Sequence, residues 1–491
     1  MPDHGIRLAD ICPALPPEWA EDPRPEIRRA IEALREKVVV LDDDPTGTQT
    51  VHDVPVLTEW SVESLAAELA NDLPVFYILT NSRSVPLSEA QDWNRQIARN
   101  LTAAADRVSR RFVVISRSDS TLRGHFPGEV EALIDGLGLA ADGILLIPFF
   151  LEGGRYTLGD IHYAADGELL IPVAETEFAK DPVFGYRNSN LRDWVEEKTG
   201  GRVSAQSVQS VSLDTIRRGG PAAVARSLCL LSGGAICIVN AASPRDLDVF
   251  TQGLLQAERA GKRFLYRTAA SFVPARCGLA PRKLLTAEDV ALGEGGGLIV
   301  VGSFVPRTST QIEVLLAETD SAALEVDAPT LLDTRRREGH IEHLAQQAAA
   351  MLRAGRDAVV RTSPGFVAGA SCEESLRMGR LISESLVDLV RAIPVRPRYF
   401  LAKGGITSSN IATAALGVRR AMVRGQVLPG VPVWELGPES RYPKLPYVVF
   451  PGNVGDSRAL LAVVRLFGSA GIAERATACV ARNQRGRRCN E

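Results

Sequence analysis

The sequence lacks the cysteine pattern of a disulfide-stabilised protein. Its seven cysteines are scattered along the chain, no two of them form a CxxC pair, and their number is odd. Secreted domains that depend on disulfides carry an even number of cysteines at regular spacings. A disulfide framework is therefore excluded, and we expect a reduced, cytosolic protein.

The sequence also lacks a strong net charge and a long apolar run. Lys and Arg number 56 against 59 Asp and Glu, and a net charge of −3 favours neither nucleic acid nor an anionic membrane. No uncharged apolar stretch reaches membrane-spanning length, and residues 1–30 contain no apolar signal core. We expect a soluble, cytoplasmic protein that would need local cations to bind an anionic substrate.

Two nucleotide-binding fingerprints are absent as well. The chain has neither the GxxxxGK[ST] of P-loop proteins nor a GxGxxG at its first strand-to-helix turn. Internal repeats of fixed period and low-complexity tracts are also missing. If the protein binds a nucleotide, it therefore does so with another phosphate cradle.

What the sequence does contain is a regular alternation of short apolar runs and amphipathic segments. Runs such as KVVVL, VFYILT and RFVVIS lie between helix-like segments, as parallel strands covered on both faces do. A chain of 491 residues also exceeds what one hydrophobic core usually organises. The pattern predicts two α/β domains, each with a largely parallel sheet flanked by helices, facing across a hinge and a cleft.

Changes in composition suggest the domain boundaries. Residues 274–297 are rich in glycine and contain two prolines, which is typical of a linker. The predicted order is an N-terminal extension (1–35), a first domain (36–273), the linker, a second domain (298–475) and a polar tail (476–491). Within the first domain, residues 150–215 have a loop-rich pattern.

Three acids, Asp42, Asp43 and Asp44, end the first predicted strand of the first domain, and Pro-Thr-Gly-Thr follows at once. Ligands of parallel sheets bind beyond the carboxyl ends of the strands, and carboxylates grouped there require a compensating cation or hydroxyl. General base, acceptor for a polyol and Mg²⁺ ligand are three suitable roles. The alternative is a solvated turn in which Asp44 or Thr46 caps the next segment.

The next three strand ends add arginines and further polar groups. Guanidinium groups match a carboxylate or phosphate bidentately, and Asp and Ser suit sugar hydroxyls. The residues are Arg83 after the second strand, Arg117, Asp119, Ser120, Thr121 and Arg123 after the third, and Glu152 and Arg155 after the fourth. Together they predict a polar pocket for a small hydroxy acid, against the alternative of scattered surface polarity.

Glycine-rich turns follow three predicted strands of the second domain. They are Gly302-Ser303, Lys403-Gly404-Gly405 and Gly452–Gly455, and a helix follows each of them, the second capped by Thr407 or Ser408. Exposed main-chain N–H groups at helix N-termini attract phosphate, and glycine permits close approach. The turns favour nucleotide binding, although glycine is also common in any strand-to-helix turn.

In sequence order these motifs resemble the four-carbon acid sugar kinases, or tetronate kinases. The family's Asp-Asp-x-Thr-Gly resembles Asp43–Gly47, its Asp-Ser-Thr-x-Arg-Gly resembles Asp119–Gly124, and its Gly-Arg-x-Thr resembles Gly154–Thr157. The Gly-Ser, Gly-Gly-x-Thr and Gly-Asn-Phe-Gly turns resemble those of the second domain. The resemblance covers about residues 36–470, whereas Asp42, Pro45 and Ile406 depart from the family's usual residues.

The resemblance implies an ATP-dependent, Mg²⁺-assisted kinase acting on the terminal hydroxyl of a four-carbon sugar acid such as threonate, erythronate or 3-oxo-tetronate. It implies Asp43 or Asp44 as the catalytic residue and leaves the metal ligands unassigned. Candidate substrate ligands are Arg83, Asp119, Ser120, Arg123 and Arg155. Candidate nucleotide ligands are Ser303, Gly404, Gly405, Ile406, Thr407, Gly452 and Gly455, with Lys403 or Asp456 near the phosphates or Mg²⁺.

Two other functions stay open at this point. A sugar-acid dehydrogenase or isomerase would suit two α/β domains, but the missing GxGxxG argues against a dehydrogenase. A non-catalytic sensor that closes on a sugar acid would bind the acid without phosphoryl transfer. We expect small-molecule ligands only, and a homodimer is left open.

Overall fold

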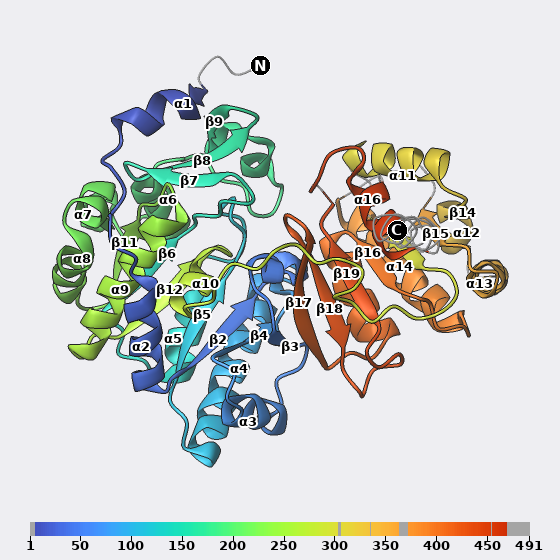
Figure 1. Cartoon of the computed structure of the whole chain (residues 1–491), viewed down its shortest axis with the longest axis horizontal. Coiled ribbons are helices and arrows are strands. Elements are labelled where there is room, and N and C mark those ends of the chain that lie inside the picture. Colours follow the sequence, from blue (N-terminus) through green and yellow to red (C-terminus); the bar gives the residue numbers. More distant parts are fainter. Residues whose placement is uncertain (1–4, 303–305, 334, 363–371, 453, 469–491) are drawn as a thin grey trace, which may run out of the picture. The chain divides into compact units, whose positions relative to one another are not determined.

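The computed structural model describes residues 5–302, 306–333, 335–362, 372–452 and 454–468. The chain divides into two compact units, Met1–Arg282 and Lys283–Glu491. The boundary between them falls inside residues 274–297, where composition suggests a linker. Each unit is an α/β fold, as predicted, and each is described by itself (Figure 1).

The first unit is built on an extended parallel sheet whose described strand pairs all run in the same direction. The apolar run at Val38–Leu41 is buried on both faces, as the alternation pattern predicts. Across the sheet the strands are β10 (Gln209–Val211), β11 (Ala235–Val239), β6 (Gly143–Ile147), β12 (Phe264–Thr268), β5 (Phe112–Arg117), β2 (Lys37–Asp42), β4 (Val75–Leu79) and β3 (Val54–Leu57).

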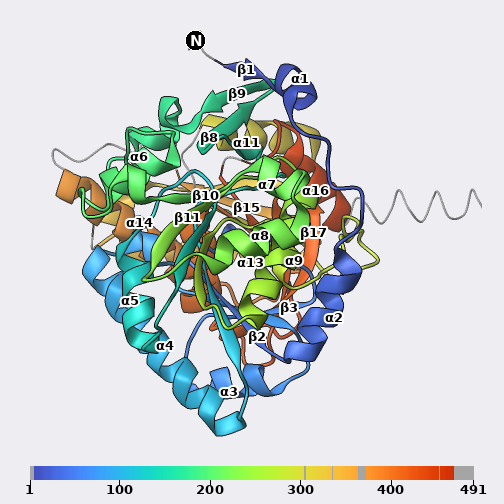
Figure 2. The same ribbon diagram turned by 90° about the vertical axis from the view of Figure 1, so that its left-hand side faces the viewer.

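Two layers of helices cover this sheet (Figures 1 and 2). One layer consists of α3 (Val62–Ala70), α4 (Leu87–Val108) and α5 (Gly128–Leu137). The other consists of α2 (Arg24–Leu34), α7 (Leu213–Arg217), α8 (Gly220–Cys229), α9 (Pro244–Arg259) and α10 (Phe272–Arg276). Helices on both faces explain why the strands are apolar throughout and polar only at their ends.

A small antiparallel sheet lies in the segment whose sequence has a loop-rich pattern. Its strands, in order, are β1 (Ile6–Arg7), β9 (Leu169–Pro172), β8 (Ile161–Asp166) and β7 (Arg155–Leu158). Gly159 and Asp160 join β7 to β8 with φ values of 57° and 66°, the left-handed conformation that a two-residue hairpin turn requires. The sequence-based reading of this segment missed the hairpin because the strands are short and polar. Two short helices, α1 (Leu8–Ile11) and α6 (Leu191–Lys198), complete the unit.

Part of the predicted N-terminal extension is packed against the first unit. Ile27 and Ala30 of α2 form an apolar cluster with Leu255 of α9. The Arg24 guanidinium lies 2.8 Å from the Asp248 carboxylate of the same helix α9. The amphipathic segment predicted within residues 1–35 thus belongs to one of the two helix layers.

The second unit has a mixed sheet. The strands in order are β17 (Arg420–Leu428), β18 (Val431–Leu436), β19 (Pro446–Phe450), β16 (Phe400–Lys403), β13 (Leu298–Val301), β15 (Ala358–Thr362) and β14 (Ala322–Val326). From β19 to β14 the pairs are parallel, whereas β17, β18 and β19 pair antiparallel. The helices are α11 (Pro306–Glu318), α12 (Ala328–Leu332), α13 (Arg337–Arg353), α14 (Cys372–Ala392), α15 (Gly405–Asn410) and α16 (Ala459–Phe467).

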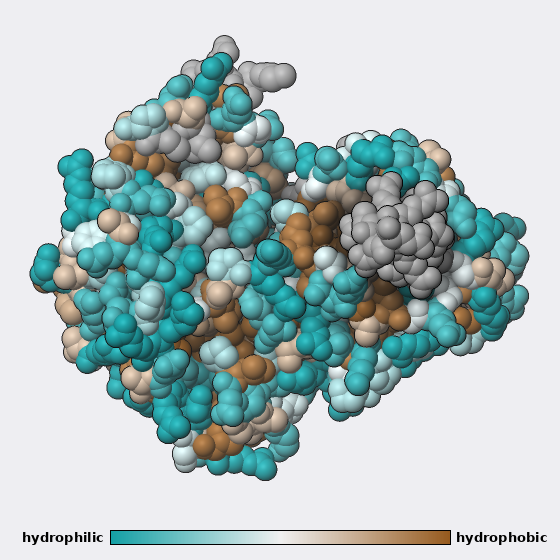
Figure 3. All heavy atoms as spheres, in the orientation of Figure 1, coloured by the Kyte–Doolittle hydropathy of each residue, from teal (hydrophilic) through white to brown (hydrophobic). Residues whose placement is uncertain are grey.

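Strands β13, β16 and β19 are direct neighbours and parallel. Their carboxyl ends therefore meet at one edge of the sheet, and with them the turns that begin at Gly302, Gly404 and Pro451. The surface of both units is predominantly hydrophilic in the view of Figure 3. Among the described residues, no helix combines the length and apolar character needed to cross a membrane.

Candidate active site

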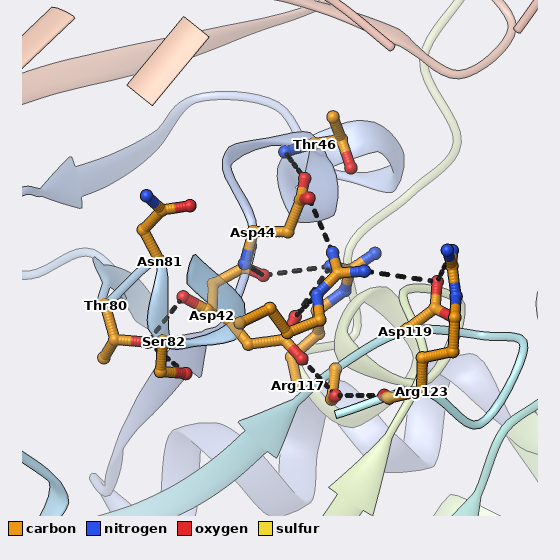
Figure 4. Close-up of polar contacts among 12 residues, drawn as sticks. Asp42, Asp44, Thr46, Thr80, Asn81, Ser82, Arg117, Asp119 and Arg123 are labelled. Atoms are coloured by element: carbon orange, nitrogen blue, oxygen red, sulfur yellow. Dashed lines mark hydrogen bonds and ion pairs between the residues drawn. The ribbon is translucent and has the colours of Figure 1, made fainter. Parts of the chain in front are cut away.

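The polar strand ends of the first unit meet at one edge of its sheet. Strands β12, β5, β2 and β4 are consecutive and parallel, so the residues that follow them come together (Figure 4). The Thr80 hydroxyl at the end of β4 donates to the Asp42 carbonyl oxygen at 3.0 Å, which ties two of these strand ends together. This edge carries all the predicted catalytic and substrate-binding residues of the first unit except Arg155, which lies in β7 of the antiparallel sheet.

The turn after β2 is a 3₁₀ helix, η2 (Pro45–Thr50), that Asp44 caps. The Asp44 carboxylate accepts a hydrogen bond from the Thr46 N–H at 2.8 Å, so of the two caps that the alternative interpretation offered, Asp44 is the one observed. The turn itself is largely buried rather than solvated. A Cβ on Gly47 would lie 1.9 Å from Asp42 Oδ2. Glycine is required at position 47 because the turn packs directly on that carboxylate.

Asp42 is almost fully buried and forms an ion pair with Arg117 from β5. Arg117 Nη1 lies 2.9 Å from Asp42 Oδ1 and 3.9 Å from Asp43 Oδ1. Burial raises the pKa of Asp42 to about 7, although Arg117 acts in the opposite direction. Asp42 Oδ2 has no hydrogen-bond partner among the described residues. The acid that departs from the family pattern is therefore held inside the sheet edge by an arginine.

Asp43 lies at the centre of the cluster with a side-chain exposure of 3%. The Ser118 hydroxyl donates to its Oδ2, and Arg83 Nε lies 3.3 Å from its Oδ1. Asp43 Oδ1 has no well-aligned hydrogen bond within the described chain. The carboxylate is thus oriented by its neighbours and keeps one oxygen available to accept a proton.

Arg83 is surrounded by acids. Its guanidinium lies 2.6 Å from the Asp44 carboxylate, 3.3 Å from that of Asp43 and 3.7 Å from that of Asp119. Burial acts to raise the pKa of Asp44, but Arg83 and Thr46 outweigh it and the pKa is lowered. Arg83 therefore joins the acids of three different positions into one network rather than standing free for a substrate carboxylate.

Asp119 and Arg123 form the other side of the cluster, in the loop after β5. Arg123 Nε donates to Asp119 Oδ2 at 2.8 Å, and the Thr121 hydroxyl donates to the same oxygen. Burial opposes ionisation of Asp119, but Arg123 and Arg83 outweigh it and hold the pKa of Asp119 below its usual range. Asp119 is therefore a fixed negative charge that can accept a hydrogen bond from a sugar hydroxyl.

Arg155 at the start of β7 reaches the same site from the antiparallel sheet. The Arg155 and Arg123 guanidiniums lie 5.2 Å and 5.1 Å from the centre of the Phe178 ring. Phe178 belongs to the 3₁₀ helix η5 (Glu177–Lys180). Ser120 is present in the loop between these groups, and its carbonyl oxygen lies 2.7 Å from Nε2 of the buried His162. The predicted substrate ligands thus converge, with Phe178 holding two cations in place.

The structure adds residues that the prediction of the site did not include. Ser118 follows β5 directly, Arg267 is the second-last residue of β12, and Glu129 lies in the first turn of α5 with its carboxyl buried. Burial raises the pKa of Glu129, and Asp43 raises it further. Arg117 was predicted from the sequence by its position at a strand end, whereas Arg267 lies in a strand that the pattern did not single out.

The glycine turns of the second unit lie beside one another. A Cβ on Gly302 would lie 2.0 Å from the Thr407 hydroxyl oxygen, so glycine is required for the first two turns to touch. Gly404 adopts a φ of 111°, and Gly405 opens helix α15 directly after it. Ile406 in the first turn of that helix is 55% exposed, which is unusual for a large apolar side chain.

The predicted cap of this helix is wrong. Helix α15 begins at Gly405, and Thr407 and Ser408 lie inside it. The Ser408 hydroxyl donates instead to the carbonyl oxygens of Ala402 and Gly404, at 2.9 and 2.8 Å. The N-cap residue of this helix is Gly404, which has no side chain. The first N–H groups of the helix therefore receive no hydrogen bond acceptor from a capping side chain.

Side chains from within the unit support the third turn. The buried Lys403 ammonium donates to the Pro451 carbonyl oxygen at 3.0 Å, and the Thr308 hydroxyl donates to that of Gly452 at 3.0 Å. Burial lowers the pKa of Lys403 to about 7. Lys403 therefore supports the third turn through a hydrogen bond to its main chain rather than pointing at a ligand. Ser303 and Asn453 lie outside the described residues.

A hollow of about 690 Å³ lies next to this turn, and its lining residues are Arg307, Thr310, Gly455, Asp456 and Ser457. Gly455 has a φ of 80°, and a Cβ there would meet the Ala459 side chain at 2.3 Å. Of the predicted nucleotide ligands, Gly455 lines this hollow. Within the described part of the chain, no cluster of three His, Cys, Asp or Glu side chains could hold a metal ion.

Comparison with known proteins matches the two halves separately. Residues 38–276 match the model of a sugar-binding N-terminal domain, and residues 298–460 match that of a nucleotide-binding C-terminal domain. The chain thus carries a match to a sugar-binding domain followed by a match to a nucleotide-binding domain.

Curated relatives carry tetronate kinase names. A D-erythronate kinase of Heliobacterium modesticaldum is 27% identical over 321 residues, which cover 63% of this chain and 66% of that protein, just under two thirds of its length. A 3-oxo-tetronate kinase of Cupriavidus necator is 27% identical over 401 residues, 79% of this chain and 84% of that protein. The chain belongs to the four-carbon acid sugar kinase family, the tetronate kinases, as the motifs predict.

Two solved structures share the fold. A protein of Salmonella typhimurium LT2 has a TM-score of 0.66 at 18% identity and covers 88% of this chain and 99% of its own. The Haemophilus influenzae protein HI1011 has a TM-score of 0.61 at 18% identity, with coverages of 87% and 100%. At this identity the likeness concerns the fold alone.

Proposed function

We propose that the protein is an ATP-dependent kinase that phosphorylates the terminal hydroxyl of a four-carbon sugar acid such as threonate, erythronate or 3-oxo-tetronate. In this proposal the first unit binds the acid and the second unit binds ATP. The observation that carries it is the cluster of acids and arginines at one sheet edge of a unit that matches a sugar-binding domain. The kinase names of the relatives support the reaction class.

Asp43 is the best candidate for the general base. Asp42 is engaged by Arg117 at one oxygen, and the turn at Gly47 packs on the other. Asp44 is engaged by both Arg83 and the Thr46 N–H. Asp43 is oriented by Ser118 and Arg83 but keeps an oxygen without an aligned hydrogen bond. An oriented carboxylate of this kind suits acceptance of the hydroxyl proton during phosphoryl transfer. Asp44 then acts on the base indirectly, by fixing Arg83.

The sugar acid would be held by the remaining members of the cluster. Asp119 and Ser120 are suited to its hydroxyl groups, and Arg155 is suited to its carboxylate, whereas Arg83 and Arg123 are paired with acids of the site. The kinase names of the relatives favour a kinase over the alternative of a sugar-acid dehydrogenase.

The nucleotide would be held mainly by the main chain of the second unit. Gly405 in the second turn, and Gly452 and Gly455 in the third, offer main-chain N–H groups with little side-chain bulk, which suits phosphate. The Gly404 N–H itself donates to the Phe450 carbonyl oxygen at 2.9 Å. The exposed Ile406 is suited to an apolar contact with the base or ribose, and Thr407 lies beside Gly302 of the first turn. Ser303 stays a candidate from the sequence. Any Mg²⁺ would be bound largely by phosphate oxygens and water, with Asp456 as a candidate single carboxylate.

The test is an ADP-release assay with Mg-ATP and a panel of four-carbon sugar acids, including threonate, erythronate and their oxidised forms. We expect turnover with at least one acid and none with ATP alone. Binding of an acid without any ADP release would favour the sensor alternative. Turnover that requires a nicotinamide cofactor would favour the dehydrogenase alternative.

A further inference from the structure

The arginines of the first unit's site fall into two groups. Arg83, Arg117 and Arg123 each lie within 4.0 Å of at least two carboxylates. Arg155 and Arg267 have no carboxylate within that distance among the described residues. Their positive charges are therefore left without an ion-pair partner inside a cluster where every other guanidinium has one.

Burial makes this difference significant. Arg267 is 7% exposed, and its Nη2 donates only to the Arg123 carbonyl oxygen, at 3.3 Å. Arg155 Nη1 donates to the Gly153 carbonyl oxygen, and its Nε has no partner in the described structure. Asp43, Glu129 and Asp119 attract Arg267 from beyond ion-pair distance. A buried guanidinium with no carboxylate in direct contact is costly, because charges removed from water require a close counter-charge. Both residues are thus prepared for an anion that the chain itself does not supply.

The pKa shifts follow the same division. Burial acts to lower the pKa of all five guanidiniums, but the neighbouring acids outweigh it for Arg83, Arg117 and Arg123, whose pKa values are raised. For Arg155 and Arg267 burial dominates, and the pKa values are lowered. The first three arginines therefore have carboxylate counter-charges in direct contact, whereas Arg155 and Arg267 have none within the described residues.

Arg267 is also close to the proposed base. A Cβ on Gly124 would lie 2.8 Å from Ser118 Oγ, 3.1 Å from Arg267 Nη2 and 3.2 Å from Asp43 Oδ2. These three atoms therefore converge on the Cα of Gly124, whose φ of 121° and missing side chain permit the approach. In a four-carbon acid only three carbon–carbon bonds separate the carboxylate carbon from the carbon that bears the terminal hydroxyl. A carboxylate subsite must then lie near the base, as Arg267 does.

Arg155 is linked to Arg267 through Arg123. Arg267 contacts the Arg123 main chain, and Arg123 shares the Phe178 ring with Arg155. Asp119 attracts both of the unpaired guanidiniums. It also lines a small cavity together with Arg267. The two unpaired cations thus border the same part of the cluster, on the side of Asp119.

We propose that Arg267 and Arg155 form the subsite that binds the substrate carboxylate, and that Arg83 and Arg123 hold the acids of the site in place. This inference rests on the proposed function and assigns the specificity for an acid to a residue of β12. Arg83 and Arg123, two of the three arginines predicted for the carboxylate, then have a positioning role.

Binding without ATP tests the assignment independently of turnover. The probes are D-erythronate and D-threonate, each compared with its primary amide, which keeps the hydroxyls but carries no charge. Isothermal titration of the full chain gives both affinities. We expect Arg267→Met to weaken binding of the acid about 100-fold and that of the amide less than threefold, because only the acid loses a charge-assisted hydrogen bond. Arg267→Lys keeps the charge and should recover part of the loss, and Arg155→Met should show the same selectivity.

Arg263→Met is the matched control, since this exposed arginine stands just before the other end of the same strand. It should leave both affinities unchanged, and thermal melts should verify the fold of each variant. Unchanged acid binding in Arg267→Met, or an equal loss for acid and amide, would overturn the assignment. So would failure of the unaltered protein to bind either acid. Selective binding without ADP release would instead contradict the kinase proposal and leave the subsite standing.

Discussion

Both units place their candidate sites at the carboxyl edge of parallel strands. The two sites differ in the chemical groups that form them. In the first unit the site consists of charged side chains such as Asp43, Arg83 and Asp119, joined in a continuous network. In the second unit it consists of glycine turns, and polar side chains such as Lys403 and Thr308 support the main chain from inside. One site depends on side-chain charge, and the other depends on backbone shape.

This difference has a consequence for specificity. A network of fixed charges distinguishes an acid from a neutral sugar and one hydroxyl position from another. Main-chain N–H groups recognise phosphate whatever the rest of the ligand is. Changes in the first unit should therefore alter chemistry and acid selectivity, whereas changes in the second should alter nucleotide affinity.

The largest expected effect is that of Asp43→Asn. The amide keeps the shape of the side chain but cannot accept the hydroxyl proton, so kcat should fall about 10³-fold. ATP affinity, measured by titration, should stay within twofold because the proposed nucleotide site lies in the other unit. Unchanged kcat would contradict the role of Asp43 as the base.

Gly47→Ala should show that the acid cluster depends on one close backbone approach. The new Cβ would lie 1.9 Å from Asp42 Oδ2, so the turn must shift. The free energy of unfolding should therefore fall by roughly 2 kcal/mol. Gly339→Ala in α13 is the control, because nothing lies within 4 Å of the added carbon there. Urea unfolding of both variants measures the difference, and equal stabilities would show that the turn adapts freely.

Lys403→Met should affect the second site through its backbone. Loss of the hydrogen bond to the Pro451 carbonyl should loosen the third turn and raise the KM for ATP about tenfold. The KM for the sugar acid should not change. A rise in the KM for the acid instead of that for ATP would break the proposed division between the units.

Asp42→Asn gives the smallest effect, a pH dependence of stability. Burial raises the pKa of Asp42 in the folded chain from 3.8 to about 7. Between pH 3.8 and 7 the carboxyl group of Asp42 is therefore protonated in the folded state but ionised in the unfolded state. The contribution of this proton to the free energy of unfolding is complete below pH 3.8 and is lost as the pH rises to 7. The stability difference between the unaltered protein and Asp42→Asn should thus shift in favour of the variant between pH 4 and 7. Denaturant unfolding across this range measures it, and a flat difference would show that Arg117 keeps Asp42 charged.

The sequence predicted the α/β fold and the polar strand ends, because buried parallel strands are apolar and their polar ends stand out. It did not predict the hairpin of β7 and β8, where short polar strands depend on the turn at Gly159 and Asp160. Nor did the sequence show which arginines are paired with carboxylates and which are not, because this pairing joins residues from different strands of the folded chain. From the sequence, Arg83 was predicted to bind the substrate, but in the fold it contacts three acids. Arg267 was not among the predicted ligands, and it has no ion-pair partner within the described residues.

The most direct test of the division between side-chain and main-chain recognition is a crystal structure of the full chain with D-erythronate, or whichever acid is turned over, and a non-hydrolysable ATP analogue. The account predicts the terminal hydroxyl of the acid at Asp43, its carboxylate at Arg267 and Arg155, and the phosphates over the turns at Gly404 and Gly452–Gly455. Phosphates bound by the arginines of the first unit, with the acid elsewhere, would contradict it.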